Sequence, residues 1–475
     1  MKINMTNSAL KILTPAIATL ALGLLPNGAK AATLYFDPNA ASPVTAGTYT
    51  WDTTTLEWAT SSTLSGSPIA WVQGDNAVFT AGSYTGSLTV DVNSTIDLAG
   101  FFDGNLTPPG STLTLADPFN TGSLVMAAGA QAVGAGGSDG NTVTMEVPMT
   151  DAGGANASTP ESEEDGVNAL YLYAPNTTTG GFILGPSSSG SAGGVVINNN
   201  SPFGTGTISS SSSTATREIT TTGTSGLTVG NAFTLWNGIL ELNAGATAPL
   251  TLSGALATSA SGNTSTLQIQ NGAVTLTGGI TGAGNFAKTG TGSLTISGAN
   301  STYTGSTTIS AGTLFLSDAN EISTTKGLIL NGGRLDPLGD NQVLGSLTLS
   351  GSSTTSYLDF EDGDFVDLQF NDSHALTWGA GDLLDIVNYN GDSQSSVPSV
   401  FNGSGDEISF GDQTGLTASQ LADIEFNSDP STIGEAALDA DGDLYQLLTP
   451  VPEPSTIALA GFGGLSLLLL KRRKA

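Results

Sequence analysis

The side chains that could do chemistry in this 475-residue chain are one histidine and a large excess of carboxylates. A Ser-His-Asp relay would depend entirely on His374, which stands in the polar segment NDSHALTW. A histidine in such a segment is more typical of a hydrogen-bonded strand or turn residue. Cysteine is absent, which excludes thiolate catalysis, zinc–cysteine sites and disulfides. These residues do not favour hydrolysis by a triad, and we predict no catalytic residue.

The distribution of charge excludes further classes of function. Positions 32–450 hold 40 of the 41 acidic residues and only four basic ones, Arg217, Lys288, Lys326 and Arg334. Such a surface repels phosphates, so nucleic-acid binding is excluded. Lyases that act on uronates need cations beside the substrate carboxylate, and four scattered basic residues are too few. A glycosidase needs only two carboxylates at suitable spacing, so it stays open as an alternative.

Two acidic clusters could bind calcium, a hard cation that prefers oxygen ligands. The first cluster comprises Asp359, Glu361, Asp362, Asp364 and Asp367. The second has carboxylates at alternate positions, Asp439, Asp441 and Asp443, as cation-binding loops do. An EF-hand starting at Asp439 would need Gly at its sixth position and Glu at its twelfth, where this chain has Leu444 and Pro450. Solvated acidic turns are the simpler interpretation, and no other cofactor is predicted.

The elements that would position these side chains are short strands. Apolar residues alternate with polar ones in many short runs bounded by Gly, Asn or Ser, among them TGSLTISG (291–298), AGTLFLSD (311–318) and LGSLTLSG (344–351). This pattern indicates strands with one buried face. Glycine and asparagine at the corners favour a coil that turns tightly at the same place in each rung. We therefore expect an all-β chain folded as a parallel β-helix, with tandem β-sandwich modules as the alternative.

The coil is expected to occupy residues 32–347, followed by an acidic capping region at 348–450. The polar, acidic stretch 151–165 is expected to be a loop or an insertion, and 204–222 is a Ser/Thr-rich, low-complexity stretch. The capping region contains one short predicted helix from Ala418 to Ile424, with Thr417 as its N-cap.

One stretch of the coil, GAGNFAKTGTGSLTISGANSTYTGSTTISAGTLFL at 282–316, resembles the autotransporter-associated β-strand repeat. Lys288 takes a repeat position, which favours a structural role for it. Two departures are visible: Phe286 stands where the family has an aliphatic residue, and one extra residue separates Asn300 from Tyr303. The resemblance implies a β-helical passenger architecture for this stretch.

Three tryptophans, Trp51, Trp58 and Trp71, lie close together near the beginning of the expected coil. Exposed aromatic side chains can stack on sugars, which is one interpretation of this group. The other is that the tryptophans cover the open core at the first rung, because the end of a solenoid must be capped. We favour capping.

The first 31 residues have the organisation of a secretory signal peptide. Lys2 and Lys11 precede a short apolar stretch, and Ala29-Lys30-Ala31 forms an A-x-A cleavage site. We expect signal peptidase to cut between Ala31 and Ala32, so that the mature chain is exported across the inner membrane.

The segment VPEPSTIALAGFGGLSLLLLKRRKA at 451–475 places a Pro-Glu-Pro triplet before an apolar run and four cations. We expect residues 455–470 to form a transmembrane helix whose basic flank stays cytoplasmic. This order resembles the PEP-CTERM sorting signal. The resemblance implies recognition and cleavage by an exosortase-type enzyme near the triplet, and association with exopolysaccharide and the cell envelope. The residues concerned are Val451, Pro452, Glu453 and Pro454 in the recognition motif, and Lys471, Arg472, Arg473 and Lys474 in the cytoplasmic tail.

These observations together predict a non-enzymatic β-solenoid that is exported, anchored in the membrane through its C-terminal segment, and then displayed at the cell surface or in the extracellular matrix. A surface carbohydrate-active enzyme and an adhesin on the same scaffold are the alternatives.

Overall fold

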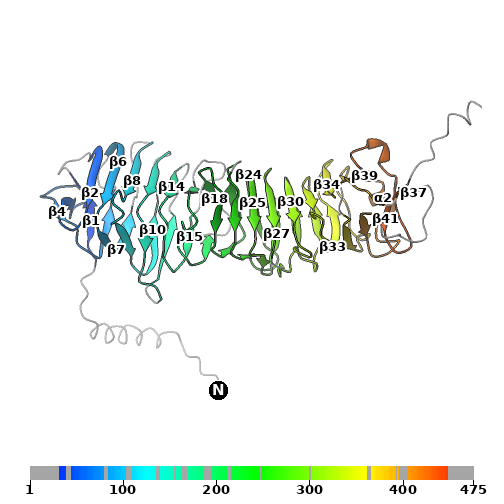
Figure 1. Cartoon of the computed structure of the whole chain (residues 1–475), viewed down its shortest axis with the longest axis horizontal. Coiled ribbons are helices and arrows are strands. Elements are labelled where there is room, and N and C mark those ends of the chain that lie inside the picture. Colours follow the sequence, from blue (N-terminus) through cyan, green and yellow to red (C-terminus); the bar gives the residue numbers. More distant parts are fainter. Residues whose placement is uncertain are drawn as a thin grey trace, which may run out of the picture.

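The computed structural model describes residues 31–447, except 39–43, 80–83, 103–109, 135–139, 155–156, 163–167, 186–193, 211–215, 246–247, 299–300, 361–364, 392 and 395–404. The described chain is an elongated coil whose strands run across its long axis (Figure 1). All but a few residues in regular elements are in β-strands. The predicted all-β solenoid is confirmed.

One 15-stranded sheet, here called the long sheet, runs the length of the coil. Its strands are β2 (Val44–Trp51), β6 (Tyr84–Val92), β8 (Thr112–Ala116), β11 (Thr142–Met145), β14 (Ala169–Leu172), β16 (Gly194–Ile197), β18 (Thr216–Thr221), β21 (Ile239–Asn243), β24 (Thr264–Asn271), β27 (Asn285–Thr289), β29 (Thr307–Ile309), β31 (Leu328–Leu330), β33 (Gln342–Leu349), β35 (Asp367–Asn371) and β38 (Glu407–Ser409).

Two further sheets complete the wall in the first part of the coil. The N-terminal sheet contains, in spatial order, β12 (Met149–Thr150), β9 (Ser123–Met126), β7 (Thr95–Phe102), β5 (Asp75–Val78), β1 (Thr33–Phe36), β3 (Leu56–Ala59) and β4 (Ile69–Ala70). The middle sheet contains β10 (Gly129–Val133), β13 (Ser158–Ser162), β15 (Phe182–Leu184), β17 (Ile208–Ser210), β20 (Phe233–Thr234), β23 (Leu256–Ala257) and β26 (Ile280–Thr281).

A nine-stranded C-terminal sheet forms the corresponding wall in the second part. It contains β19 (Leu227–Val229), β22 (Leu250–Leu252), β25 (Ala273–Leu276), β28 (Ser293–Ile296), β30 (Thr313–Leu316), β32 (Arg334–Asp336), β34 (Thr355–Asp359), β36 (Leu383–Val387) and β39 (Ile424–Phe426). The last elements are the short strands β37 (Ser393–Gln394), β40 (Ala436–Leu438) and β41 (Leu444–Leu447), the helix α2 (Ala418–Leu421) and the 3-10 turn η1 (Pro430–Thr432).

Strands of successive coils pair in parallel, and this pairing aligns the apolar positions of the alternating sequence pattern. In β28, Leu294 pairs with Val274 of the preceding coil and Leu314 of the following one, and all three side chains are fully buried. Apolar residues therefore stack in columns along the bore while the intervening residues face outward. The sandwich alternative is wrong, because each of these strands pairs in parallel with the equivalent strand one coil away.

Buried aromatic side chains close the N-terminal end. Trp51 and Trp58 are fully buried with ring centroids 4.9 Å apart, and Trp71 packs 5.1 Å from Trp51. Phe36 and Phe79 extend the same cluster. The capping interpretation is confirmed, because these rings face the core and present no platform to a sugar.

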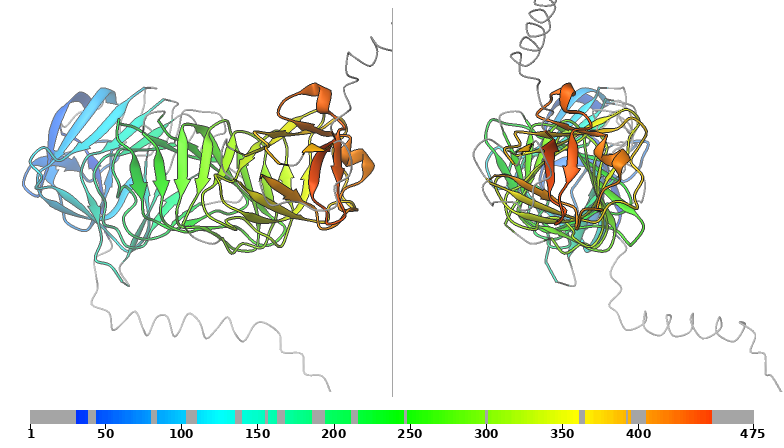
Figure 2. Two further views of the ribbon diagram at one scale, coloured as in Figure 1. Left: turned by 45° about the vertical axis from the view of Figure 1, so that its right-hand side comes forward. Right: turned by 90° about the vertical axis from the view of Figure 1, so that its right-hand side faces the viewer.

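The C-terminal end is covered by α2 and the short strands that follow the coil, as Figure 2 shows. The parallel sheets continue beyond position 348, through β39, before this cover begins. Thr417 is the N-cap, as predicted, and Gln420 completes a capping box. The prediction that this helix reaches Ile424 is wrong, because it ends at Leu421 and Ile424 begins strand β39.

Two polar stretches of the sequence contribute strands, so the prediction of a loop or insertion at 151–165 is wrong for Ser158–Ser162. The acidic stretch 151–165 contains β13, which lies between β10 and β15, and the stretch 204–222 contains both β17 and β18. Neighbouring coils supply the backbone partners, so polar residues take part in the wall despite their composition. Within the described residues, no helix has the length and apolar character that crossing a membrane requires.

Candidate functional site

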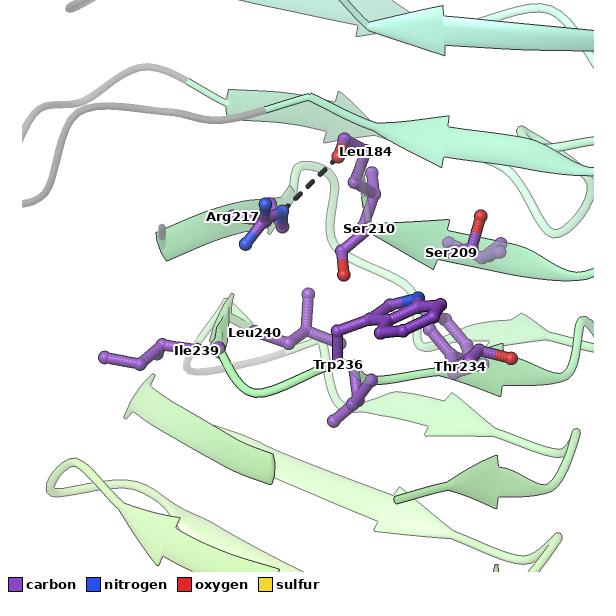
Figure 3. A pocket seen from close by; sticks show the side chains of 12 residues that line it. Leu184, Ser209, Ser210, Arg217, Thr234, Trp236, Ile239 and Leu240 are labelled. Atoms are coloured by element: carbon purple, nitrogen blue, oxygen red, sulfur yellow. Dashed lines mark hydrogen bonds between the residues drawn. The ribbon is translucent and has the colours of Figure 1, made fainter. Parts of the chain in front are cut away.

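A partly open depression lies on the side of the coil where the middle sheet turns into the long sheet (Figure 3). It is shallow, with a cavity volume of only about 10 Å³, which is room for about one water molecule. Trp236 is its largest side chain and is 55% exposed, whereas the other tryptophans of the described chain are buried. Hydroxyl-bearing residues of the adjoining strands, Ser209, Ser210 and Thr234, line the same depression.

The backbone around Trp236 is held firmly by neighbouring coils. Leu235 donates its N–H to the carbonyl of Ala257 at 2.9 Å and accepts from Ser265 Oγ at 3.0 Å. Gly238 donates to the Trp236 carbonyl at 2.6 Å, which closes the turn that leads into β21. A fixed backbone limits the conformational entropy that the indole would lose on binding a ligand.

Arg217 lines the inner side of the depression. It lies on β18 at a core-facing position paired with Leu240, and only 2% of the residue is exposed. Its Nε donates to the Leu184 carbonyl at 3.4 Å (Figure 3). Burial lowers the pKa of Arg217, but a guanidinium keeps its charge at neutral pH. The residue therefore places a fixed, buried positive charge in the wall of the depression.

This arrangement is suited to binding rather than to bond cleavage. An exposed indole offers an apolar face to the C–H face of a sugar ring, and the hydroxyls of Ser209, Ser210 and Thr234 can bond to sugar oxygens. The described residues that line the depression include no carboxylate or histidine.

Two carboxylates do lie side by side on the outer face of the long sheet, close to this depression in sequence. Glu218 of β18 pairs with Glu241 of β21. Thr220 Oγ1 donates to Glu218 at 2.8 Å, and Gln268 Nε2 donates to Glu241 at 3.2 Å. Burial raises the pKa of Glu218, and the neighbouring Glu241 raises it further. Two neighbouring carboxylates, one of them with a raised pKa, are the minimum that a glycosidase requires.

Lys288 has a structural environment, as its repeat position suggested. It is fully buried on β27, and its Nζ donates to the carbonyls of Thr289 (3.2 Å), Gly290 (2.8 Å), Gly292 (2.5 Å) and Ala311 (2.9 Å). Burial lowers the pKa of Lys288 to about 8. The ammonium thus satisfies the inward-facing carbonyls of the corner between the long and C-terminal sheets.

His374 forms a local pair with Asp372. Its Nδ1 lies 2.6 and 2.8 Å from the two carboxylate oxygens, and both side chains are about half exposed. Hydrogen bonds from the His374 backbone and ring lower the pKa of Asp372. The backbone bond spans only two residues, which is the geometry of an Asx turn.

The carboxylates considered for calcium are largely engaged by protein groups. Asp439 Oδ1 accepts the N–H groups of Asp441 and Asp443 at 2.9 and 3.0 Å. Burial raises the pKa of Glu407 to about 7, with Asp443 adding to the effect. No group of three or more acidic or histidine side chains with metal-binding geometry occurs in the described part of the chain.

In the first predicted cluster, Asp359 pairs with Arg334 and accepts from Asn388 at 2.6 Å. Asp367 accepts from Gln369 Nε2 at 2.5 Å. Glu361, Asp362 and Asp364 lie outside the described residues.

The predicted processing sites are only partly described. Ala31 and Ala32 precede β1, whereas Ala29 lies outside the described residues. So does the whole sorting segment 451–475, with its triplet, its predicted transmembrane stretch and its basic tail. The depression at Trp236 was not predicted. The sequence alone does not show whether a tryptophan at the end of an alternating run points inward or outward, because this depends on the turn after β20.

Comparison with known proteins supports both resemblances. The passenger-associated-transport-repeat model matches residues 286–314, and the PEP-CTERM protein-sorting motif model matches residues 450–474. A curated relative, the adhesin BmaC autotransporter of Brucella suis biovar 1 (strain 1330), is 30% identical over 205 residues. The match covers 38% of this chain but only 6% of that protein. No solved structure matches the chain. The chain therefore carries a passenger-type repeat and a PEP-CTERM motif.

Proposed function

We propose that this protein is a non-enzymatic surface solenoid that is sorted by an exosortase-type enzyme and associates with exopolysaccharide outside the cell. The observation that carries the proposal is the PEP-CTERM match at 450–474 behind a passenger-type coil. The motif implies processing by an exosortase-type enzyme, and the strongly acidic coil suits a solvated extracellular position. Signal peptidase would release the body by cutting after Ala31.

The depression at Trp236 is the proposed contact with polysaccharide. Its exposed indole and three hydroxyl-bearing residues provide stacking and hydrogen bonding. A neutral polymer is the favoured ligand class, because the strongly acidic coil repels a polyanion. The adhesin name of the curated relative is compatible with such a binding role.

The test uses the full chain expressed in its native cells. Trp236→Ala should weaken the affinity for isolated exopolysaccharide, measured by co-sedimentation, by about five- to thirteenfold, which corresponds to a stacking contribution of about 1–1.5 kcal/mol. Phe119→Ala is the matched control, since Phe119 is 67% exposed and lies outside the depression. Equal retention of both variants and the wild type would remove the depression from the proposal.

A second candidate, glycoside hydrolysis, is favoured by one observation, the Glu218–Glu241 pair. If these carboxylates are catalytic, wild-type protein releases reducing ends from the polymer and Glu241→Gln abolishes the release. We expect no release by either protein. Any activity that disappears in Glu241→Gln would make the protein an enzyme.

A further inference from the structure

The backbone nitrogen of Ala32 lies against a carboxylate. Ala32 N donates to Asp75 Oδ1 at 2.8 Å, and Asp75 is only 9% exposed. The Ala32 carbonyl accepts from the N–H of Asn76 at 2.8 Å, next to the β1–β5 pair formed by Thr33 and Asn76. The position of Ala32 is therefore fixed from both sides at the start of the first strand.

We propose that cleavage between Ala31 and Ala32 creates an α-ammonium group that forms an ion pair with Asp75 and locks the first strand onto the N-terminal cap. Hydrolysis breaks the peptide bond, adding the hydroxyl of water to the Ala31 carbonyl carbon and its proton to the Ala32 nitrogen. At neutral pH the new amine takes up a further proton from solvent. The donor that faces Asp75 then changes from a neutral amide to a cation without moving.

A neutral amide does not require an aspartate, since any carbonyl or hydroxyl oxygen would accept its hydrogen bond. A largely buried carboxylate is better matched by a cation. Ala32 itself is exposed, so the two additional N–H groups of the ammonium can be solvated. The site therefore accommodates the processed end at least as well as the unprocessed chain.

The ion pair would act on the aromatic cap. β1 lies between β5 and the hairpin of β3 and β4, and its Phe36 packs 5.4 Å from Trp58 and 5.1 Å from Phe79. Fixing the first residue of the mature chain holds Phe36 over this cluster. Processing would thus complete the end of the solenoid as well as releasing it from its signal peptide.

The proposal implies a definite pH dependence. An opposite charge at hydrogen-bond distance raises the pKa of an α-amino group, which is roughly 7.7–8.0 when unperturbed, by about one unit or more. The stabilisation is fully present below the unfolded pKa and is lost as the pH rises through the higher folded pKa.

The test uses the exported protein recovered from its native cells. Sequencing of the N-terminus should find Ala32 first. The pH dependence of α-amine acylation, followed by mass spectrometry of the N-terminal peptide, should give an amine pKa raised by about one unit or more. Asp75→Asn should return it to the ordinary value. Asp52→Asn is the control, because Asp52 belongs to the same cap and bonds to Thr54 and Thr55.

If Asp75→Asn is not exported, acetylation of the wild-type α-amine replaces it. Acetylation should lower the thermal midpoint at pH 7, and the difference should vanish above the folded pKa of the amine. A different N-terminal residue, an amine pKa unaffected by Asp75→Asn, or no effect of acetylation would overturn the proposal. The proposed ion pair rests on the export part of the proposed function. A mature chain that begins at Ala32 with an unperturbed amine would refute the ion pair and leave export intact.

Discussion

Replacing Lys288 with methionine removes a buried ammonium while keeping a side chain of similar length. In the structure Nζ serves four backbone carbonyls, at 2.5–3.2 Å, in the corner that follows β27. Methionine can fill the space but cannot donate a hydrogen bond. The variant therefore leaves acceptors unsatisfied inside the wall of the coil.

The size of the effect follows from two opposing terms. Each buried acceptor that loses its partner costs about 1–3 kcal/mol, so the loss of three ammonium donors costs roughly 6 kcal/mol. Burial lowers the pKa of Lys288 from 10.5 to about 8, and removing this desolvated charge returns roughly 3 kcal/mol. We expect a net destabilisation of about 3 kcal/mol.

Urea denaturation followed by far-UV circular dichroism measures the change. Hydrogen exchange should also show faster exchange at the amides around residues 290–292 and 311–313, where the carbonyls lie. Lys326→Met is the matched control, because Lys326 is exposed and the chemical change is the same. If the two variants differ by less than about 0.5 kcal/mol, the corner does not depend on the ammonium and the reasoning is wrong.

Three further predictions concern stability. Gly312→Ala should cost about 2 kcal/mol or more in urea denaturation, because Gly312 has φ +61° and a Cβ there would collide with the neighbouring coil and Lys288 Nζ; a neutral substitution would contradict this corner geometry. Burial raises the pKa of Glu321 to about 7, so its contribution to stability is present below the unfolded pKa of 4.5 and is lost as the pH rises to about 7. The stability of Glu321→Gln relative to wild type should therefore be up to about 3 kcal/mol greater at pH 8 than at pH 4.5. The exposed control Glu146→Gln should show no such change. If the stabilities of Glu321→Gln and wild type change in parallel with pH, the effect is excluded. Trp58→Ala should destabilise the N-terminal cap by about 3–5 kcal/mol and speed exchange of its amides before those of the middle coils, and uniform exchange along the chain would refute a separate cap.

Much of the fold was predictable because one rule applies to every coil. Alternation of apolar and polar residues indicates a strand with one buried face, and regularly spaced glycines indicate corners. The repeat position of Lys288 indicates a structural cation from the sequence alone, and the tryptophan cluster likewise indicates an end cap. Both have the environments that those interpretations required.

The errors arose where partners on other coils override local preference. β13 contains Pro160 and Glu161, which disfavour a strand, yet β10 and β15 supply its backbone pairing. Ile424 continued the apolar pattern of the predicted helix, but pairing with Leu384 places it in β39. The exposure of Trp236 depends on the turn closed by Gly238, and alternation alone cannot distinguish an inward from an outward residue at the end of a strand.

The central claim is that the C-terminal motif sorts this solenoid to the cell exterior. Intact-mass and C-terminal peptide analysis of the protein recovered from its native cells tests it most directly. Processing by an exosortase-type enzyme predicts an extracellular chain that ends near Pro452, Glu453 and Pro454 and lacks the basic tail Lys471–Lys474. Recovery of the protein only in the membrane fraction, with an intact KRRKA end, would contradict the account.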